Sequence, residues 1–238
     1  MAMASPAIFL SYFQIDQYLL RHCAYFSQYL DAREKDELVR RRFLHAQHRS
    51  QYIYSRLMLK TMLSDAINVK PRLLRVHTMA SGQPKLFASG FGLDNVSLSI
   101  SHDRDRLLVA AGCRCRIGVD IQIIHGVEWP LVMFAMGWSA DVQRCLFEER
   151  SRSPGILMTL DSLSALIWAG YESWLKLSGC TATPADFAWN SINLVEKYSV
   201  IDCPIYEMRL SDECLYNEAR ILLMLRSNDA LAVATLPS

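Results

Sequence analysis

The sequence predicts an α+β protein of two pseudo-symmetric halves, each a long helix packed on a small antiparallel sheet. Helical periodicity covers residues 48–67 in the first half and 162–179 in the second. Strand-like segments follow each of these helices. Because no low-complexity linker separates the halves, we expect one compact unit with subdomains over residues 1–114 and 115–238.

The composition is typical of a globular protein of the cytoplasm. The chain has 238 residues, 51% of them hydrophobic and 21% charged, and a net charge of +1. No apolar run reaches the ~18 residues of a membrane span, and the N-terminus has no basic region before its apolar part. Seven scattered cysteines indicate reduced thiols, and Cys113 and Cys115 are too close together for a usual zinc pair.

Two segments of the first half carry polar residues of interest. Ser81 to Lys85 reads as a turn, and residues 97–112 alternate as two strands joined by a polar turn after His102. The first of these strands puts serines on one face and Leu98, Ile100 and His102 on the other. The other elements expected in this half are a strand at 7–13, helices at 14–30 and 31–45, and a strand at 73–78.

The second half begins with a strand over residues 116–124. Its period of two places isoleucine and valine on one face and puts Asp120 beside Gln122 on the other. A strand with one solvated face would have the same pattern, so the pattern alone leaves open whether Asp120 and Gln122 belong to a functional site or to a solvated face. The other elements expected in this half are helices at 131–136 and 140–149, and strands at 187–194, 204–210, 220–225 and 231–236.

The helix over residues 162–179 is apolar on all sides, which is typical of a buried helix. Asp161 or Ser162 is expected to cap its start and Gly179 its end. Glu172 and Lys176 lie one turn apart on it, and as an exposed pair they would contribute only about 0.2–0.5 kcal/mol. A buried carboxylate must instead be paired, protonated or bound to metal, so this helix is a candidate wall of a functional site.

A local cation cluster, Arg40–Arg42, admits three interpretations. It is a solvated helix face, a binding site for a phosphate-rich ligand, or a nucleic-acid contact. The near-neutral net charge and the lack of interleaved aromatic residues count against nucleic acid.

Four blocks in register resemble the Sfp-type 4′-phosphopantetheinyl transferases. They are Gly82-Gln83-Pro84 for the family's GKP, Ser99-Ile100-Ser101-His102 for its N-[IL]-S-H, Ile117-Gly118-Val119-Asp120-Ile121 for its G-[IV]-D-[IV]-E, and Trp168 to Gly179 for its W-x-x-K-E-[AS]-x-x-K-x-x-G. A weaker match covers Arg41 to Leu63. The resemblance implies the transferase fold of this family, with the active site at the interface of the subdomains.

The resemblance also implies an enzyme that moves phosphopantetheine from coenzyme A to a carrier-protein serine and releases 3′,5′-ADP. Asp120 and Glu172, with Gln122 beside them, are expected to hold Mg²⁺. Glu172 is expected to take the serine proton, Lys176 to assist the leaving group, and His102 to contact phosphate. The residues expected to contact coenzyme A are Arg49, Ser50, Gly82, Gln83, Pro84, Lys85, Ser101, His102 and Lys176.

Three positions depart from the family's pattern. Gln122 stands where many members have a metal-binding glutamate, Tyr171 replaces a lysine beside Glu172, and Gln83 replaces the lysine of GKP. Lys85 or Arg40–Arg42 are candidates to compensate for the two lost cations. The alternative is therefore a non-catalytic module that binds coenzyme A or a carrier protein. We expect a cytoplasmic monomer whose partner is an apo carrier of fatty acid, polyketide or peptide synthesis, with no nucleic-acid or membrane partner.

Overall fold

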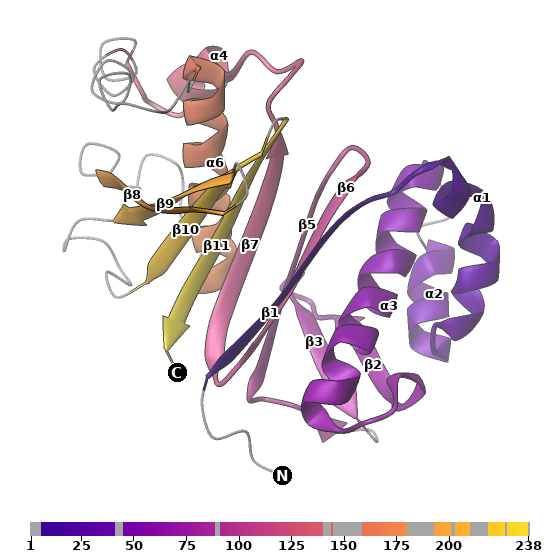
Figure 1. The fold of residues 1–238 in the computed structure, drawn as a ribbon. Coiled ribbons are helices and arrows are strands. Elements are labelled where there is room, and N and C mark those ends of the chain that lie inside the picture. The colour runs from indigo at the N-terminus through magenta and orange to yellow at the C-terminus, as the bar shows by residue number, and fades with distance from the viewer. Residues whose placement is uncertain are drawn as a thin grey trace. The chain divides into compact units, whose positions relative to one another are not determined.

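The computed structural model confirms the α+β class, with helices and small antiparallel sheets (Figure 1). It describes residues 6–40, 45–88, 91–139, 144, 159–179, 193–200, 203–209, 219–226 and 228–237. The chain divides into two compact units, Met1–Gly118 with Pro237–Ser238, and Val119–Leu236. Among the helices in the described ranges, none has the length and apolar character needed to cross a membrane.

The first unit combines a helical layer with two three-stranded sheets, ordered β1-β6-β5 and β2-β3-β4. The pairings within both sheets are antiparallel. The helices are α1 (Gln17–Phe26), α2 (Ala32–Arg40) and α3 (Ala46–Ile67), with short 3₁₀ turns η1 (Ser27–Tyr29) and η2 (Pro71–Leu73). The strands are β1 (Ala7–Gln14), β2 (Leu74–Thr78), β3 (Pro84–Ala88), β4 (Phe91–Gly92), β5 (Val96–Asp103) and β6 (Arg106–Cys113).

The core of the first unit lies between α3 and its sheets. Strand β6 is the middle strand of its sheet, and Leu107, Val109 and Ala111 on it are fully buried. They pack in one cluster with Leu59 and Leu63 of α3. The long helix predicted at 48–67 is thereby confirmed, although it begins two residues earlier.

A buried ion pair joins three elements of this unit. The carboxylate of Glu34 on α2 accepts hydrogen bonds from Lys60 Nζ on α3 at 2.5 Å and from the Val76 N–H on β2 at 2.8 Å. Glu34 is fully buried and Lys60 is 3% exposed. Removing either partner would leave an uncompensated buried charge, so the pair fixes α2 against α3 and β2.

The second unit has a five-stranded sheet ordered β7-β11-β10-β9-β8, with α6 packed against it through β10. Its elements are β7 (Cys115–Ile123), whose first residues belong to the first unit, α4 (Trp129–Ala135), α6 (Leu160–Ser178), β8 (Asn193–Val200), β9 (Cys203–Arg209), β10 (Arg220–Leu225) and β11 (Asp229–Pro237). Helix α6 approaches the sheet closely, because a Cβ at Gly170 would lie only 2.5 Å from Cε of Met208.

Helix α6 has the buried character that its sequence predicts, but its first cap differs. Thr159 is the N-cap, and its hydroxyl accepts a hydrogen bond from the Ser162 N–H at 3.1 Å. The predicted cap at Asp161 or Ser162 is therefore wrong, because the helix begins earlier, at Leu160. Gly179 ends the helix in the left-handed region, at φ 68°, as predicted.

Other predictions need smaller corrections. The turn predicted at 81–85 overlaps the start of β3, and no strand was predicted for the segment in which β3 and β4 lie. The helix predicted at 14–30 starts at Gln17 and passes into η1, because Asp16 caps it by accepting from the Leu19 N–H. The predictions that fall outside the described residues are the helix at 140–149 apart from residue 144, Arg41 and Arg42, and most of the strand at 187–194.

Candidate functional site

The polar residues predicted on β7 and α6 form one cluster in the second unit. We call Asp120, Gln122, Glu172 and Lys176 the Asp120 cluster. Lys176 Nζ donates to Asp120 Oδ1 at 2.5 Å, and Gln122 Nε2 donates to Asp120 Oδ2 at 2.6 Å. The predicted adjacency of Asp120 and Gln122 is confirmed, and the helix contributes the third member of the contact.

Asp120 is almost completely removed from solvent. It is 2% exposed, although it lies on the face of β7 that carries the polar residues. Gly118 on the same face is also buried, whereas Arg116 and Gln122 are half-buried. This face is therefore covered around Asp120 and partly solvated toward its ends. A buried carboxylate of this kind is retained only where cations or hydrogen-bond donors compensate the lost hydration, and Lys176 and Gln122 supply both.

Glu172 has the electrostatics expected of a proton acceptor. Burial raises its pKa above the ordinary value for a glutamate, and the negative charge of Asp120 raises the pKa further. The ammonium of Lys176 acts in the opposite direction and lowers the pKa. Glu172 therefore responds to both charged partners of the cluster, and its pKa is moved toward the range useful for general acid–base chemistry.

The donors of the Asp120 cluster suit a hard divalent cation. Two carboxylates and one amide offer oxygen ligands, which Mg²⁺ prefers, and Mg²⁺ is held in proteins by one or two carboxylates together with water and phosphate. The negative charge of Asp120 raises the pKa of Glu172, and a cation bound between the two carboxylates would relieve their repulsion. Within the described parts of the chain, no group of three or more His, Cys, Asp or Glu side chains converges as a metal site.

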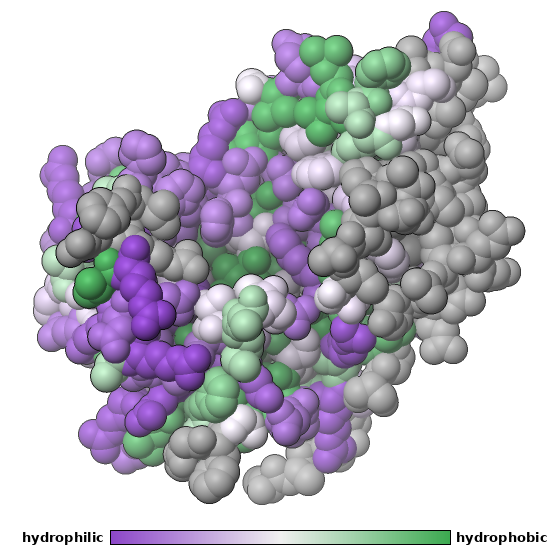
Figure 2. Space-filling view, turned by 180° about the vertical axis from the view of Figure 1, so that it is seen from behind, coloured by the Kyte–Doolittle hydropathy of each residue, from purple (hydrophilic) through white to green (hydrophobic). Residues whose placement is uncertain are grey.

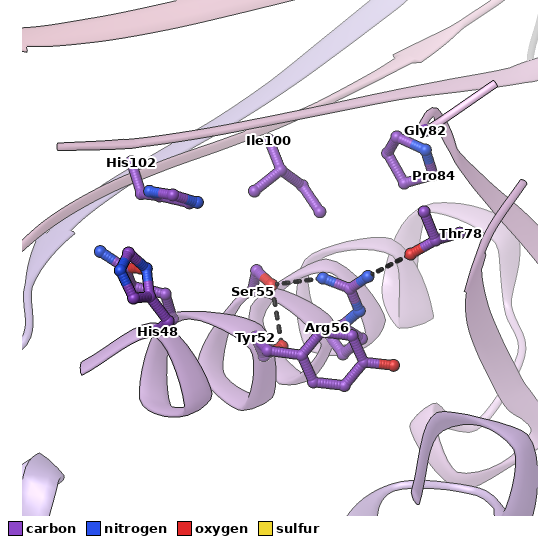
Figure 3. Close-up of a pocket in the computed structure, with 10 residues that line it drawn as sticks. His48, Tyr52, Ser55, Arg56, Thr78, Gly82, Pro84, Ile100 and His102 are labelled. Atoms are coloured by element: carbon purple, nitrogen blue, oxygen red, sulfur yellow. Dashed lines mark hydrogen bonds between the residues drawn. The ribbon is translucent and has the colours of Figure 1, made fainter. Parts of the chain in front are cut away.

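A separate polar pocket of about 390 Å³ lies within the first unit (Figure 3). We call it the α3 pocket. Side chains of α3 line one side and Ile100 and His102 of β5 line another. Its lining comprises His48, Gln51, Tyr52, Ser55, Arg56, Thr78, Gly82, Pro84, Ile100 and His102.

Arg56 provides the buried positive charge of the α3 pocket. Its guanidinium donates to Ser55 Oγ at 3.0 Å and to Thr78 Oγ1 at 2.8 Å, and it lies 3.8 Å from the centre of the Tyr52 ring. These contacts hold the planar group in one orientation, which favours recognition of a phosphate or carboxylate. Burial raises the pKa of the Tyr52 phenol well above its usual range, while the charge of Arg56 opposes that rise.

Two histidines approach each other at the α3 pocket. The rings of His48 and His102 are 6.0 Å apart between centroids and meet edge to face. Gln51 connects their elements, because its Nε2 donates to the Arg104 carbonyl at 2.6 Å and its Oε1 lies 3.1 Å from His48 Nδ1. Arg104 has a positive φ of 50°, so this bond holds the tight turn that follows His102.

The α3 pocket includes some of the predicted coenzyme A contacts and leaves out others. Gly82, in the left-handed region at φ 83°, Pro84 and His102 line it. The remaining predicted residues of this unit lie elsewhere in the described structure: Arg49 is exposed on α3, Ser50 is buried and donates to the Ala46 carbonyl, Ser101 is buried on β5, Gln83 is exposed in its turn, and Lys85 pairs with Asp94 at 2.7 Å.

Sequence reasoning missed the polar stripe of α3. His48, Gln51, Tyr52, Ser55 and Arg56 recur at the three- and four-residue spacing of one helix face. That periodicity was visible in the sequence as a complement to the apolar stripe. Thr78 had no comparable signal, since only strand pairing and the fold of α3 bring it to the pocket.

Comparisons with known proteins add no relative to this picture. No protein-family model matches the chain, and the search of curated proteins finds no match. The Asp120 cluster and the α3 pocket are therefore the features from which a function is argued.

Proposed function

We propose that this protein transfers 4′-phosphopantetheine from coenzyme A to a serine of an apo carrier protein, in a Mg²⁺-dependent reaction that releases 3′,5′-ADP. The Asp120 cluster is the observation that carries the proposal. It gathers, from a strand and a helix, the carboxylates and the lysine that such a reaction needs, at the positions where the sequence resembles the transferase family.

The metal-binding part of the proposal rests on Asp120, Glu172 and Gln122. Asp120 and Glu172 would hold Mg²⁺, and Gln122 would offer its amide oxygen or hold a metal-bound water. Bound Mg²⁺ supplies neutralisation of pyrophosphate charge. Lys176 occupies Asp120 Oδ1 here at 2.5 Å and so provides the compensating positive charge within the cluster.

The protein's own groups have distinct roles in the transfer. Glu172 accepts the proton of the carrier serine, and its raised pKa makes it a better base than an ordinary glutamate. The serine oxygen then forms a bond to the phosphorus that bears pantetheine. The bond from that phosphorus to the bridging oxygen breaks, and 3′,5′-ADP departs with the bonding pair while Lys176 compensates its negative charge.

The α3 pocket supports the proposal separately. Its held guanidinium and its two histidines are groups that bind phosphate, and about 390 Å³ is within the range of small-molecule sites. We assign it to a phosphorylated part of coenzyme A, with His102 as the phosphate contact.

A carrier protein needs a docking surface, and α4 offers an apolar one. Leu131 and Phe134 are each 65% exposed. Hydrophobic side chains gather in the same region at the upper edge of Figure 2. Exposed apolar patches of this kind mark interaction surfaces, so we assign α4 to the carrier.

The second candidate function is a non-catalytic module that binds coenzyme A or a carrier protein. Tyr171, which replaces a lysine of the family's pattern, is 1% exposed inside the core of the second unit. Lys85, a candidate to replace the missing cation, pairs with Asp94. The replacement of a lysine by Tyr171 and the pairing of Lys85 with Asp94 both reduce the positive charge available to a pyrophosphate, and they favour this alternative.

Intact-mass measurement of the carrier distinguishes the two functions. The full chain is incubated with coenzyme A, Mg²⁺ and each of several apo carrier proteins, with calorimetric titration of coenzyme A in parallel. The proposal predicts a carrier that gains the mass of phosphopantetheine with wild-type protein and not with Asp120→Asn. Binding of coenzyme A without mass gain on any carrier would establish the non-catalytic module instead.

A further inference from the structure

A second cavity, distinct from the α3 pocket, lies in the first unit between the end of α1, α3 and η2. We call it the η2 cavity. Its volume is about 780 Å³, within the range of small-molecule binding sites. None of its lining residues belongs to the α3 pocket or to the Asp120 cluster, so the proposed transfer gives it no role.

The walls of the η2 cavity are apolar along most of their extent. Phe26, Leu30, Leu57 and Pro71 line it, and Leu30 is 3% exposed. Tyr29, which is 55% exposed, contributes an aromatic ring at the surface. An open cavity with walls of this kind suits a hydrocarbon chain, because moving apolar surface out of water is favourable.

The charges at the η2 cavity are arranged asymmetrically. Lys60 also lines it, but the Lys60 ammonium is matched by the buried Glu34 carboxylate. Asp31 is matched as well. Burial favours its neutral form, yet the Glu34 N–H, His77 and Lys60 outweigh burial and hold the pKa of Asp31 below its ordinary value.

Two cations at the η2 cavity have no such match. Lys70 and Arg72 are both exposed and flank Pro71, and neither forms an ion pair with another residue in the described part of the chain. The cavity therefore combines an apolar interior with a net positive rim.

We propose that the η2 cavity binds a free amphipathic monoanion, a hydrocarbon chain with one carboxylate. The chain lies against Phe26, Leu30 and Leu57, and the carboxylate is bound by Lys70 and Arg72. A neutral lipid would leave Lys70 and Arg72 without an anionic partner. A polyanion would place its further charges against the apolar walls. The inference goes beyond the proposed transfer and does not depend on it.

Calorimetric titration of the full chain with decanoate, below its micelle concentration, tests the proposal. Decanol is the matched neutral ligand. We expect saturable binding of decanoate, with decanol about tenfold weaker, the size of one charge-assisted hydrogen bond. The variant Lys70→Ala/Arg72→Ala changes only exposed side chains and should remove that difference, leaving the affinity for decanol unchanged.

Thr61→Trp provides a test of location. Thr61 is exposed on α3 and lines the η2 cavity, so an indole there obstructs the cavity without entering the core. This variant should bind neither ligand, whereas His102→Ala, in the α3 pocket, should bind decanoate like wild type. Equal affinity for decanoate and decanol, absence of binding, or unchanged binding by Thr61→Trp would overturn the proposal. Sedimentation with anionic vesicles without binding of free decanoate would also overturn it, and would assign the surface to a membrane.

Discussion

Lys176 on α6 and Asp120 on β7, 56 residues apart in the chain, meet in a hydrogen-bonded ion pair of 2.5 Å. The two side chains differ in exposure, at 31% for the lysine and 3% for the aspartate. The buried carboxylate needs the lysine to compensate its lost hydration, whereas the half-buried lysine keeps part of its own hydration. This relationship connects the stability of the second unit with the chemistry proposed for it.

Lys176→Met should destabilise the protein by about 2 kcal/mol, because it removes the Lys176 ammonium that compensates the buried Asp120 carboxylate. Urea unfolding of the full chain at neutral pH measures the change. Lys176→Arg is the matched control and should retain most of the stability. An unchanged free energy of unfolding for Lys176→Met would show that Asp120 is compensated without the lysine.

The raised pKa of Glu172 predicts a pH dependence of stability. The folded state holds the Glu172 proton more tightly than the unfolded state, so the group stabilises the fold at low pH. That contribution is lost as pH rises from the ordinary value of 4.5 through the raised pKa. Wild-type stability should therefore fall relative to Glu172→Gln over this window, as measured by urea unfolding at several pH values.

The exposed Glu128→Gln is the control for loss of one negative charge. It should follow the wild type across the whole pH range. If Glu128→Gln and Glu172→Gln had the same pH profile, the environment assigned to Glu172 would be incorrect.

Substitution of the two carboxylates should separate binding from rate in the transfer reaction. Glu172→Gln should retain coenzyme A binding and lose at least about 10²–10⁴-fold in rate, because it removes a general base, which contributes that much, and also weakens the Mg²⁺ site. Asp120→Ala should abolish transfer without loss of fold. Initial rates of holo-carrier formation and circular dichroism provide the two readouts. Wild-type turnover by Glu172→Gln would remove it from the base role, and turnover by Asp120→Ala would place the metal elsewhere.

The α3 pocket has its own prediction. His102→Ala should weaken binding of 3′,5′-ADP about tenfold, because it removes a phosphate contact from an exposed position that the core does not depend on. Calorimetry measures the affinity. His125→Ala, at an exposed position of the second unit, is the matched control and should bind like wild type. Equal affinities of the two variants would exclude His102 as a phosphate contact.

Periodicity predicted the local part of this structure, and long-range packing decided the rest. The alternation of β7 predicted Asp120 beside Gln122, and the all-round apolar pattern predicted a buried α6. The burial of Asp120 was not predictable, because it depends on which elements cover the second face of the strand. Strands β3 and β4 were missed because the residues around Gly82 signal a turn more strongly than a strand.

The same distinction holds for the candidate sites. Motif positions identified Glu172 and Lys176, but their spacing predicted a pair with each other, whereas the structure pairs Lys176 with Asp120. In the α3 pocket, Arg56 and Thr78 are joined across 22 residues by a hydrogen bond of 2.8 Å. No local pattern encodes a contact of that kind, so the buried arginine became visible only in the folded chain.

Mn²⁺ titration followed by electron paramagnetic resonance measures whether Asp120 and Glu172 share one divalent cation. Wild-type protein should bind a single Mn²⁺ that Mg²⁺ displaces. Asp120→Asn and Glu172→Gln should each weaken that binding strongly, and Glu128→Gln should not change it. Undiminished Mn²⁺ binding by both carboxylate variants, or no binding by the wild type with coenzyme A present, would show that these two carboxylates do not share a cation.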